Sequence, residues 1–354
     1  MEDNFWKNKK VLITGGTGFL GKHLADALLK KDAILRILDF RKPVEEIKGI
    51  EFFEADIRDK NKINELCRGS DLIFHLAAMP SIAKGKFKQY YEVNVLGTNN
   101  ILEGAHNYGI KKVVHVSSST VYGMPREFPL KETSPTQPLG KYSSTKLEAE
   151  RLCNEFMNKG ISISIIRPRV IIGPGRIGIF SILFERIINN KPVYILGKGD
   201  NVFQFTNVFD MASACIKAAE YEKSDLFNIG CEEVSPVKEE LKGLISYAKS
   251  SSQIISLPAN LTKAGLWALS FLGMSPLVEE QFMIADKNFK LDTTYAKEKL
   301  DWFPIYSNLD SLIQAYDWYA KNENLASRQY KSLFSVLGKF RHSHLGGFQN
   351  QKRG

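Results

Sequence analysis

Two side chains suited to acid–base chemistry lie in the segment YSSTKLEAERL, where Tyr142 and Lys146 are four residues apart. In a helix, this spacing brings both side chains out of the same face, one turn apart. A phenol with a pKa of about 10 is a poor base at neutral pH, but a neighbouring ammonium group lowers that pKa toward the working range. The pair therefore predicts a site that takes a proton from a hydroxyl group and returns it. Because the same spacing occurs by chance on many helices, this interpretation needs support from the rest of the chain.

A glycine-rich turn near the N-terminus gives that support. The apolar run VLIT leads directly into glycines spaced G-x-x-G-x-x-G, and a helical pattern follows at once. Such a turn lets the backbone approach a pyrophosphate, and the helix N-terminus offers N–H groups and a positive dipole end to the phosphates. A glycine-rich turn without a ligand is the alternative. The residues predicted to contact a dinucleotide here are Gly15, Thr17, Gly18, Phe19, Leu20 and Gly21.

The choice of dinucleotide depends on the end of the second apolar run, where Asp39 lies. A carboxylate at this point accepts both ribose hydroxyls and repels a 2′-phosphate, so Asp39 favours NAD over NADP. Arg41 keeps NADP as an alternative, because a guanidinium can pair with a phosphate. Asp56, after the third apolar run, could bond the adenine amine or serve as an ordinary helix cap.

The elements that must position these residues follow from the rhythm of the chain, in which short β-rich apolar runs alternate with amphipathic helical segments. That rhythm predicts an α/β fold, a Rossmann-type doubly wound parallel sheet with helices on both faces. The apolar runs are residues 9–15, 34–40, 50–56, 71–78, 111–118 and 161–168.

Three regions are predicted along the chain. Residues 8–172 carry the regular alternation and form the NAD-binding Rossmann domain. In residues 173–325 the alternation weakens and Pro/Gly-rich breaks separate shorter elements, which predicts a smaller α/β substrate lobe, parts of which return to the first domain. Residues 326–354 are basic and without a clear period, and we interpret them as a mobile tail.

Several short motifs occur in one consistent order. They are TGGTGFLG, Asp56-Ile57, HLAA at 75–78, Asn94 in VNVLGT, SSSTVYG at 117–123, the Tyr142/Lys146 pair and Arg167-Pro168. Together they resemble the extended short-chain dehydrogenases, the group that includes NAD-dependent sugar epimerases and dehydratases and the 3β-hydroxysteroid dehydrogenase relatives. The resemblance covers roughly residues 10 to 320.

The resemblance implies roles for further residues. Ser118 would hold the same substrate oxygen as Tyr142, with Ser119 and Thr120 as neighbouring alternatives that also line the substrate side. Lys146 would also grip the nicotinamide ribose. The further cofactor contacts that the resemblance implies are Ile57, Leu76, Ala77, Ala78 and Pro168.

Other polar residues have plainer interpretations. Asn94 resembles the asparagine that steadies the active-site backbone in this family, and a simple N-cap is the alternative. His75 is expected to be a packed residue at a strand end rather than an acid or base. His342 and His344 lie in the tail, where a solvated segment is favoured over metal binding, and no metal site is predicted.

The two residues after the catalytic hydroxyl narrow the choice of reaction. Sugar-nucleotide dehydratases of the family have an Asp-Glu pair there, because removal of water needs an acid and a base beyond the tyrosine. Ser119 and Thr120 hold those positions, so dehydration is disfavoured. Sugar 4-epimerisation is favoured, with net alcohol–ketone conversion of the hydroxysteroid type as the alternative and a non-catalytic NAD-binding regulator as a third.

The substrate is expected to be a sugar on a nucleotide diphosphate or a polyprenyl diphosphate. Phe203 stands where the epimerases have an arginine for the diphosphate, and Val170 where the galactose epimerases have an asparagine. Arg169 and Arg176 are therefore predicted to bind the substrate's negative charge. Lys198 and Lys287 are further candidates, and all four are solvated surface residues in the alternative interpretation.

Composition and charge limit which binding partners and which cell compartment are expected. The formal net charge of +9 suits anionic ligands, but no nucleic-acid motif occurs. Scattered cysteines and the absence of a signal-like N-terminal segment favour the cytoplasm. The apolar segment 257–278 is expected to pack in the core, with a peripheral membrane contact beside Lys263 as the alternative. A homodimer is expected by analogy only.

Overall fold

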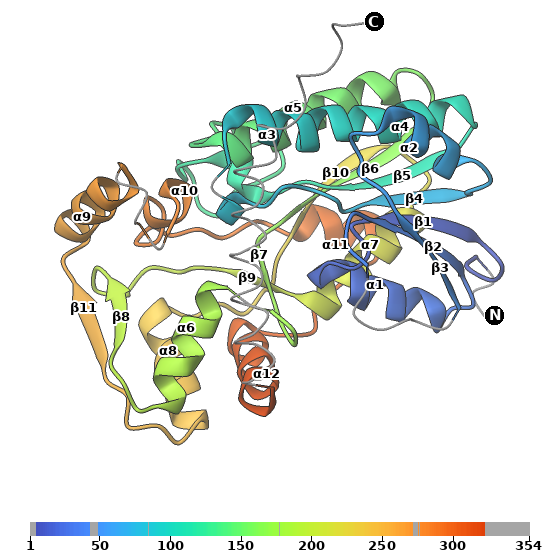
Figure 1. Cartoon of the computed structure of the whole chain (residues 1–354). Helices are drawn as coiled ribbons and strands as arrows, with labels where there is room; N and C mark the ends of the chain where they lie inside the picture. The colour runs from blue at the N-terminus through green and yellow to red at the C-terminus, as the bar shows by residue number, and fades with distance from the viewer. Residues whose placement is uncertain are drawn as a thin grey trace, which may run out of the picture.

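The computed structural model describes residues 5–42, 49–83, 85–176, 178–271, 275 and 277–322. Its centre is a seven-stranded parallel sheet in the order β10-β6-β5-β4-β1-β2-β3, which confirms the predicted Rossmann-type fold (Figure 1). The chain reverses its direction of winding between β1 and β4, and ligands of such sheets bind at that point. The strands are β1 (Lys10–Thr14), β2 (Ile34–Asp39), β3 (Ile50–Glu54), β4 (Leu72–His75), β5 (Lys112–Val116), β6 (Ser162–Pro168) and β10 (Asp225–Ile229).

Helices cover both faces of this sheet because its strands are apolar on both sides. In β1, Val11 and Ile13 join the core beneath α1 and α7, whereas Leu12 joins the core beneath α2, α4 and α5. The bounds on the first face are α1 (Phe19–Leu29), α7 (Val208–Glu220) and α11 (Thr294–Leu300). On the second face they are α2 (Lys60–Cys67), α4 (Gly97–Asn107) and α5 (Lys141–Met157).

A third core lies beside the sheet and is built on Phe184, Leu244 and Leu312. Helices α6 (Ile179–Ile188), α8 (Val237–Tyr247) and α12 (Asn308–Lys321) surround it. Two parallel strand pairs accompany them: β7 (Val170–Ile172) with β9 (Phe205–Asn207), and β8 (Val193–Leu196) with β11 (Ile254–Leu257). The remaining short elements are η1 (Ser81–Ala83), α3 (Phe87–Tyr91), the π-helical η2 (Glu92–Leu96), η3 (Ser119–Tyr122) and α10 (Glu279–Phe282).

The part of the chain after residue 172 contributes to the third core and also to the core on the first face of the sheet. Strand β10 pairs in parallel with β6, and α7 and α11 pack on the first face of the sheet. The predicted division at residues 172 and 173 stays a prediction, and the predicted tail, 326–354 with His342 and His344, lies outside the described residues.

One expectation about packing is wrong. Helix α9 (Ala259–Phe271) was expected to bury its apolar residues, but none of its described residues is buried. Helical periodicity shows which residues share a face, whereas it does not show whether another element covers that face.

A buried ion pair ties α5 to β6 beneath the predicted site. The Arg167 guanidinium donates to both carboxylate oxygens of Glu150 (Nε–Oε1 3.0 Å, Nη2–Oε2 2.6 Å), and Ser117 Oγ donates to Oε1 at 2.5 Å. Both charged side chains are almost fully buried. In such a pair each charge depends on the other, because neither can be hydrated.

We expect Arg167→Met to lower the free energy of unfolding by about 3–5 kcal/mol, because it leaves the Glu150 carboxylate buried without its cation. Urea unfolding followed by circular dichroism measures this loss. Arg151→Met is the matched control, because Arg151 pairs with Glu148 at the surface of the same helix and its loss should cost less than about 1 kcal/mol. Equal losses in the two variants would contradict a special role for the buried pair.

Candidate active site

The glycine turn lies between β1 and α1, at the switch point of the sheet. Gly15 has a φ of +70°, and a side chain there would meet the Ala77 backbone N at 2.8 Å. A Cβ on Gly21 would lie 2.5 Å from the Gly15 carbonyl oxygen, so helix and turn are in contact. Gly18 is the N-cap of α1 and provides no side-chain cap. The first N–H groups of α1 are therefore available to an anion, which fits a dinucleotide pyrophosphate.

The predicted ribose partner lies beside this turn. Asp39 ends β2 and accepts hydrogen bonds from the backbone N–H groups of Thr17 and Arg41, each at 3.2 Å. Its carboxylate is thus held against the turn by two donors. The Arg41 guanidinium lies over the Phe40 ring, with a buried Nε that has no hydrogen-bond partner in the described part of the chain. Burial lowers the pKa of Arg41, against the opposing charge of Asp39.

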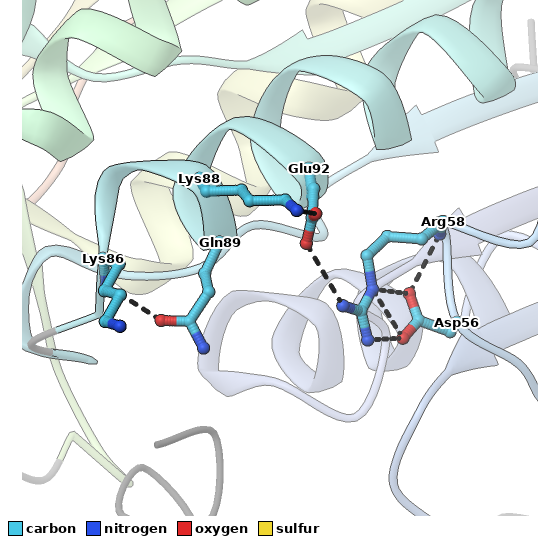
Figure 2. Close-up of polar contacts among 6 residues, drawn as sticks. All are labelled: Asp56, Arg58, Lys86, Lys88, Gln89 and Glu92. Atoms are coloured by element: carbon cyan, nitrogen blue, oxygen red, sulfur yellow. Dashed lines mark hydrogen bonds and ion pairs between the residues drawn. The ribbon is translucent and has the colours of Figure 1, made fainter. Parts of the chain in front are cut away.

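Asp56, the predicted adenine partner, is engaged by its neighbour. Both carboxylate oxygens accept hydrogen bonds from Arg58, which also reaches Glu92 at 3.7 Å. Figure 2 shows Arg58 between these two carboxylates, with Lys88 on the far side of Glu92 and the Lys86–Gln89 cap of α3 beside them. Burial tends to raise the pKa of Asp56, but the Arg58 hydrogen bonds outweigh it and the pKa is lowered. The adenine contact stays a prediction.

The other predicted cofactor residues lie on several elements of the sheet and its helices. Ala77 contacts Gly15, and Ile57 is buried against Gly97. Leu20 and Leu76 pack toward the core of the first face, Phe19 opens α1, Ala78 follows Ala77, and Pro168 ends β6.

His75 is a packed residue, as expected. Its Nδ1 lies 2.7 Å from Thr14 Oγ1 and its Nε2 lies 2.9 Å from Thr98 Oγ1, and the ring is buried. Burial lowers the pKa of His75 to about 3, and the Lys146 charge adds to this. The ring is therefore neutral and has no free nitrogen for catalysis.

Asn94 does not cap a helix but lies within the π-helical turn η2. Its Oδ1 accepts from the Met79 N–H at 2.7 Å, and its Nδ2 donates to Thr145 Oγ1 at 3.0 Å. Thr145 belongs to α5, between Tyr142 and Lys146. Asn94 therefore joins the loop after β4 to the predicted catalytic helix.

Tyr142, Lys146 and Ser118 come together at the centre of the molecule. Ser118 follows β5 as the cap of η3, and its Oγ accepts from the Thr120 N–H and hydroxyl at 3.2 and 2.9 Å. The Ser118 hydroxyl lies near enough to the Tyr142 phenol to lower the pKa of that phenol. Lys146 is buried one turn along α5, with Nζ 3.4 Å from His115 Nε2. Ser119 is buried, whereas Thr120 is half-buried.

Burial and the neighbouring charges shift the pKa values of Tyr142 and Lys146 in opposing directions. Burial raises the pKa of Tyr142 to about 12; the nearby Ser118 hydroxyl and the charge of Arg176 lower it, whereas Glu280 raises it. Burial lowers the pKa of Lys146 to about 8, and Cys153 and Glu150 oppose that change. A phenol in this site needs added positive charge before it can act as a base near neutral pH.

Two arginines predicted to bind the substrate are partly or fully enclosed. Arg169 is 2% exposed and lies between the rings of Phe203 and Phe289, 4.2 and 3.9 Å from their centroids. Its Nε and Nη2 have no hydrogen-bond partner in the described residues, and burial lowers its pKa to about 9. Arg176 lies over Phe19 at 5.3 Å. By contrast, Lys198 and Lys287 are exposed, as solvated residues would be.

Glu280 is a site residue that the sequence did not reveal. It belongs to α10, and its Oε1 accepts from Ser143 N at 3.3 Å and from Ser143 Oγ at 3.0 Å, in the first turn of α5. A Cβ on Gly140 would meet the same carboxylate at 2.1 Å, so a larger residue there would displace the Glu280 side chain. Glu280 thus caps the predicted catalytic helix from 137 residues away in the sequence. Near α5 itself, the glycine at position 140 is the one sequence feature that relates to this contact.

The fold and this cluster define the class of the protein, an extended short-chain dehydrogenase with its tyrosine and lysine on one helix face. The sequence profile of the NAD dependent epimerase/dehydratase family matches residues 11–230. The chain belongs to this family. That membership confirms the predicted enzyme class and NAD as the cofactor.

Individual relatives agree with this assignment. The chain is 34% identical to the "uncharacterized protein y4nG" of Sinorhizobium fredii, over 89% of this chain and 79% of that protein. It is 30% identical to the UDP-N-acetyl-alpha-D-glucosaminuronate decarboxylase of Bacillus cytotoxicus, over 89% and 99%. The crystal structure of UDP-glucose 4-epimerase with UDP-glucose from Thermotoga maritima matches with a TM-score of 0.75 and 25% identity, over 89% and 99%.

We expect Asp39→Asn to weaken NAD binding about tenfold, because a neutral amide makes weaker hydrogen bonds to the ribose hydroxyls than a carboxylate does. NADP binding should improve relative to NAD, because the repelling charge is gone. Titration calorimetry with both cofactors measures the ratio. Asp26→Asn, an exposed change on α1, is the control, and an unchanged NAD-to-NADP ratio in Asp39→Asn would refute the role of Asp39.

We expect Glu280→Gln to shift the acid limb of the pH–rate profile toward lower pH. The carboxylate raises the pKa of Tyr142, so a neutral amide lowers it and more phenolate is present at a given pH. The amide oxygen can still accept from Ser143, which preserves the cap. Glu279→Gln, at an exposed neighbour, should leave the profile unchanged, and a shift to higher pH in Glu280→Gln would reverse the assigned sign.

Proposed function

We propose that this protein is an NAD-dependent 4-epimerase of a diphosphate-linked sugar. The observation that carries the proposal is the proximity of the Ser118 hydroxyl to the Tyr142 phenol, with the buried Lys146 one helical turn further along α5. Two hydroxyl groups then converge where a substrate hydroxyl would bind, and a cation lies beside them.

The proton chemistry belongs to Tyr142. In the oxidation step its phenolate takes the proton of the C4 hydroxyl while Ser118 holds the same oxygen. In the return step Tyr142 gives the proton back to the C4 oxygen of the keto-sugar. Bound NAD would accept the hydride from C4 of the sugar and later return it. The positive charge of its nicotinamide ring would lower the pKa of the Tyr142 phenol. Rotation of the keto-sugar between the two steps inverts C4.

Lys146 has two tasks in this proposal. Its ammonium group favours the Tyr142 phenolate, and it would donate hydrogen bonds to the nicotinamide ribose. With its pKa near 8, the amine keeps much of its charge at neutral pH. The NAD pyrophosphate would lie on the N–H groups at the start of α1, and Asp39 would hold the adenosine ribose.

The environment of Arg169 supports a substrate whose sugar is linked to a diphosphate, which the protein binds. A guanidinium that is buried between two phenyl rings, with two nitrogen atoms lacking partners among the described residues, is costly unless an anion joins it. The Bacillus cytotoxicus and Thermotoga maritima relatives act on UDP-linked sugars by their names, which supports a nucleotide diphosphate as the handle. Arg176, close enough to act on Tyr142, would bind near the sugar end.

The proposal is tested by following a panel of UDP-, GDP- and dTDP-sugars with NMR while NADH absorbance is recorded. Epimerisation converts the sugar with no net change in NADH, because the hydride returns to its substrate. Net NADH in step with product would instead support the dehydrogenase alternative. Release of carbon dioxide from a uronic sugar would indicate decarboxylation, and failure to turn over any nucleotide sugar would contradict a nucleotide diphosphate as the part of the substrate that the protein binds.

We expect Tyr142→Phe to reduce turnover by about 10²–10⁴-fold with NAD affinity nearly unchanged, because only the proton carrier is lost. Steady-state kinetics and cofactor titration measure the two effects. Tyr108→Phe, an exposed phenol at the end of α4, is the matched control and should retain full activity. Unchanged turnover in Tyr142→Phe would remove the catalytic assignment.

A further inference from the structure

Helix α9 has the reverse of the pattern expected at a protein surface. A surface helix turns polar residues to solvent and an apolar stripe inward. From Leu261 to Phe271 the solvent-exposed side of α9 spans an arc of about 200°, at about 100° per residue, and holds only apolar residues and glycine; Asn260, in the first turn, is an exposed polar residue on the same side. Ser270 is also exposed, on the opposite side. The members of the arc are Leu261, Ala264, Gly265, Trp267, Ala268, Leu269 and Phe271.

The polar contacts of α9 lie on its inner side. Lys263 Nζ donates to Asp286 Oδ1 at 2.5 Å and to the Met283 carbonyl oxygen at 2.9 Å, and both charged side chains are largely buried. This ion pair fixes the rotation of the helix. The apolar arc therefore faces outward, with Leu261 74% and Phe271 87% exposed.

We propose that α9 is a membrane-docking helix that lies in the surface of a lipid bilayer. An arc of about 200° is wider than the stripe of about 100° that a helix buries against a protein, whereas acyl chains and headgroups can surround it. Tryptophan and phenylalanine, here Trp267 and Phe271, are favoured at the membrane interface.

The length of α9 determines how it meets the bilayer. Its 13 residues extend about 20 Å, which is shorter than a hydrocarbon core of about 30 Å. No helix in the described ranges is long and apolar enough to cross a membrane. The helix therefore lies parallel to the surface.

Charge favours an anionic bilayer. The chain carries a net charge of +9, and α9 itself has no acidic residue. Residues 323–354 contain six lysines and arginines and one acidic residue, so the sequence after α12 adds attraction to anionic headgroups.

Docking through α9 would bring the candidate active site close to the bilayer. Helix α9 packs against α10, which carries the Glu280 cap of the catalytic helix, and Figure 1 shows both helices at the end of the molecule remote from β3. A substrate on a polyprenyl diphosphate would be within the reach of such a site. The docking proposal itself does not rest on the proposed function, because binding to vesicles is measured without turnover.

The test uses the full chain and vesicles of phosphatidylcholine with and without phosphatidylglycerol, separated by flotation. Trp267 is 58% exposed, Trp6 and Trp302 are buried, and Trp318 on α12 is half-buried, so in a Trp318→Phe background a blue shift of tryptophan emission on vesicle binding reports on α9. Leu261→Ser/Phe271→Ser keeps this probe and should weaken vesicle binding about tenfold or more. Phe303→Ser/Ile305→Ser removes exposed apolar side chains outside α9 and should bind like the native chain.

Circular dichroism and NAD affinity, unchanged in both double variants, would show that the fold is intact. Three results would overturn the proposal. The native chain fails to bind any vesicle; the α9 variant binds as tightly as the native chain, which would leave only electrostatic attraction; or α9 instead mediates self-association in light scattering, lost in the variant, with no binding to vesicles.

Discussion

The site depends on a chain of buried hydrogen bonds whose direction is fixed at one end. The Thr98 hydroxyl donates to the Asn94 carbonyl oxygen, so it must accept from His75 Nε2. Because the lowered pKa keeps the imidazole neutral, His75 Nδ1 then accepts from the Thr14 hydroxyl, which in turn accepts from the Ala77 N–H. With the neutral imidazole, every proton in the chain is assigned. The contact between Gly15 and Ala77 places one end of this chain at the cofactor turn.

The other end of the chain reaches the catalytic helix through a change in helix geometry. A π-helical turn inserts an extra residue, and such turns commonly occur at functional sites. In η2 the turn directs Asn94 to both the Met79 backbone and Thr145. Thr145 lies between Tyr142 and Lys146, so the orientation of these two side chains is coupled to the loop after β4. Cofactor turn and proton carrier are thus held by one network rather than by separate loops.

The local parts of this arrangement were predictable, and the long-range parts were not. The strand rhythm, the glycine turn and the Tyr142/Lys146 spacing are short patterns, and the fold, family and cofactor follow from them. The Glu280 cap joins residues far apart in the chain, and the rings around Arg169 come from two different segments, so no spacing predicts either. Helix α9 shows a different limit, because its periodicity predicted a common face while its exposure depends on the elements that pack against it.

The placement of Glu280 also bears on which reactions the site can perform. Dehydration needs an acid and a base besides the tyrosine. Glu280 acts on Tyr142 through its charge, but Ser143 N–H and Oγ hold one of its oxygens and Gly140 packs against the carboxylate, so it is tied to the start of α5. A carboxylate fixed in this way caps α5 and raises the pKa of Tyr142, and it is not placed to exchange a proton with a sugar carbon. With Ser119 and Thr120 after Ser118, Tyr142 is the proposed proton carrier among the described residues of this cluster. A single proton carrier suits a reaction that removes and returns one proton at one oxygen, as epimerisation does.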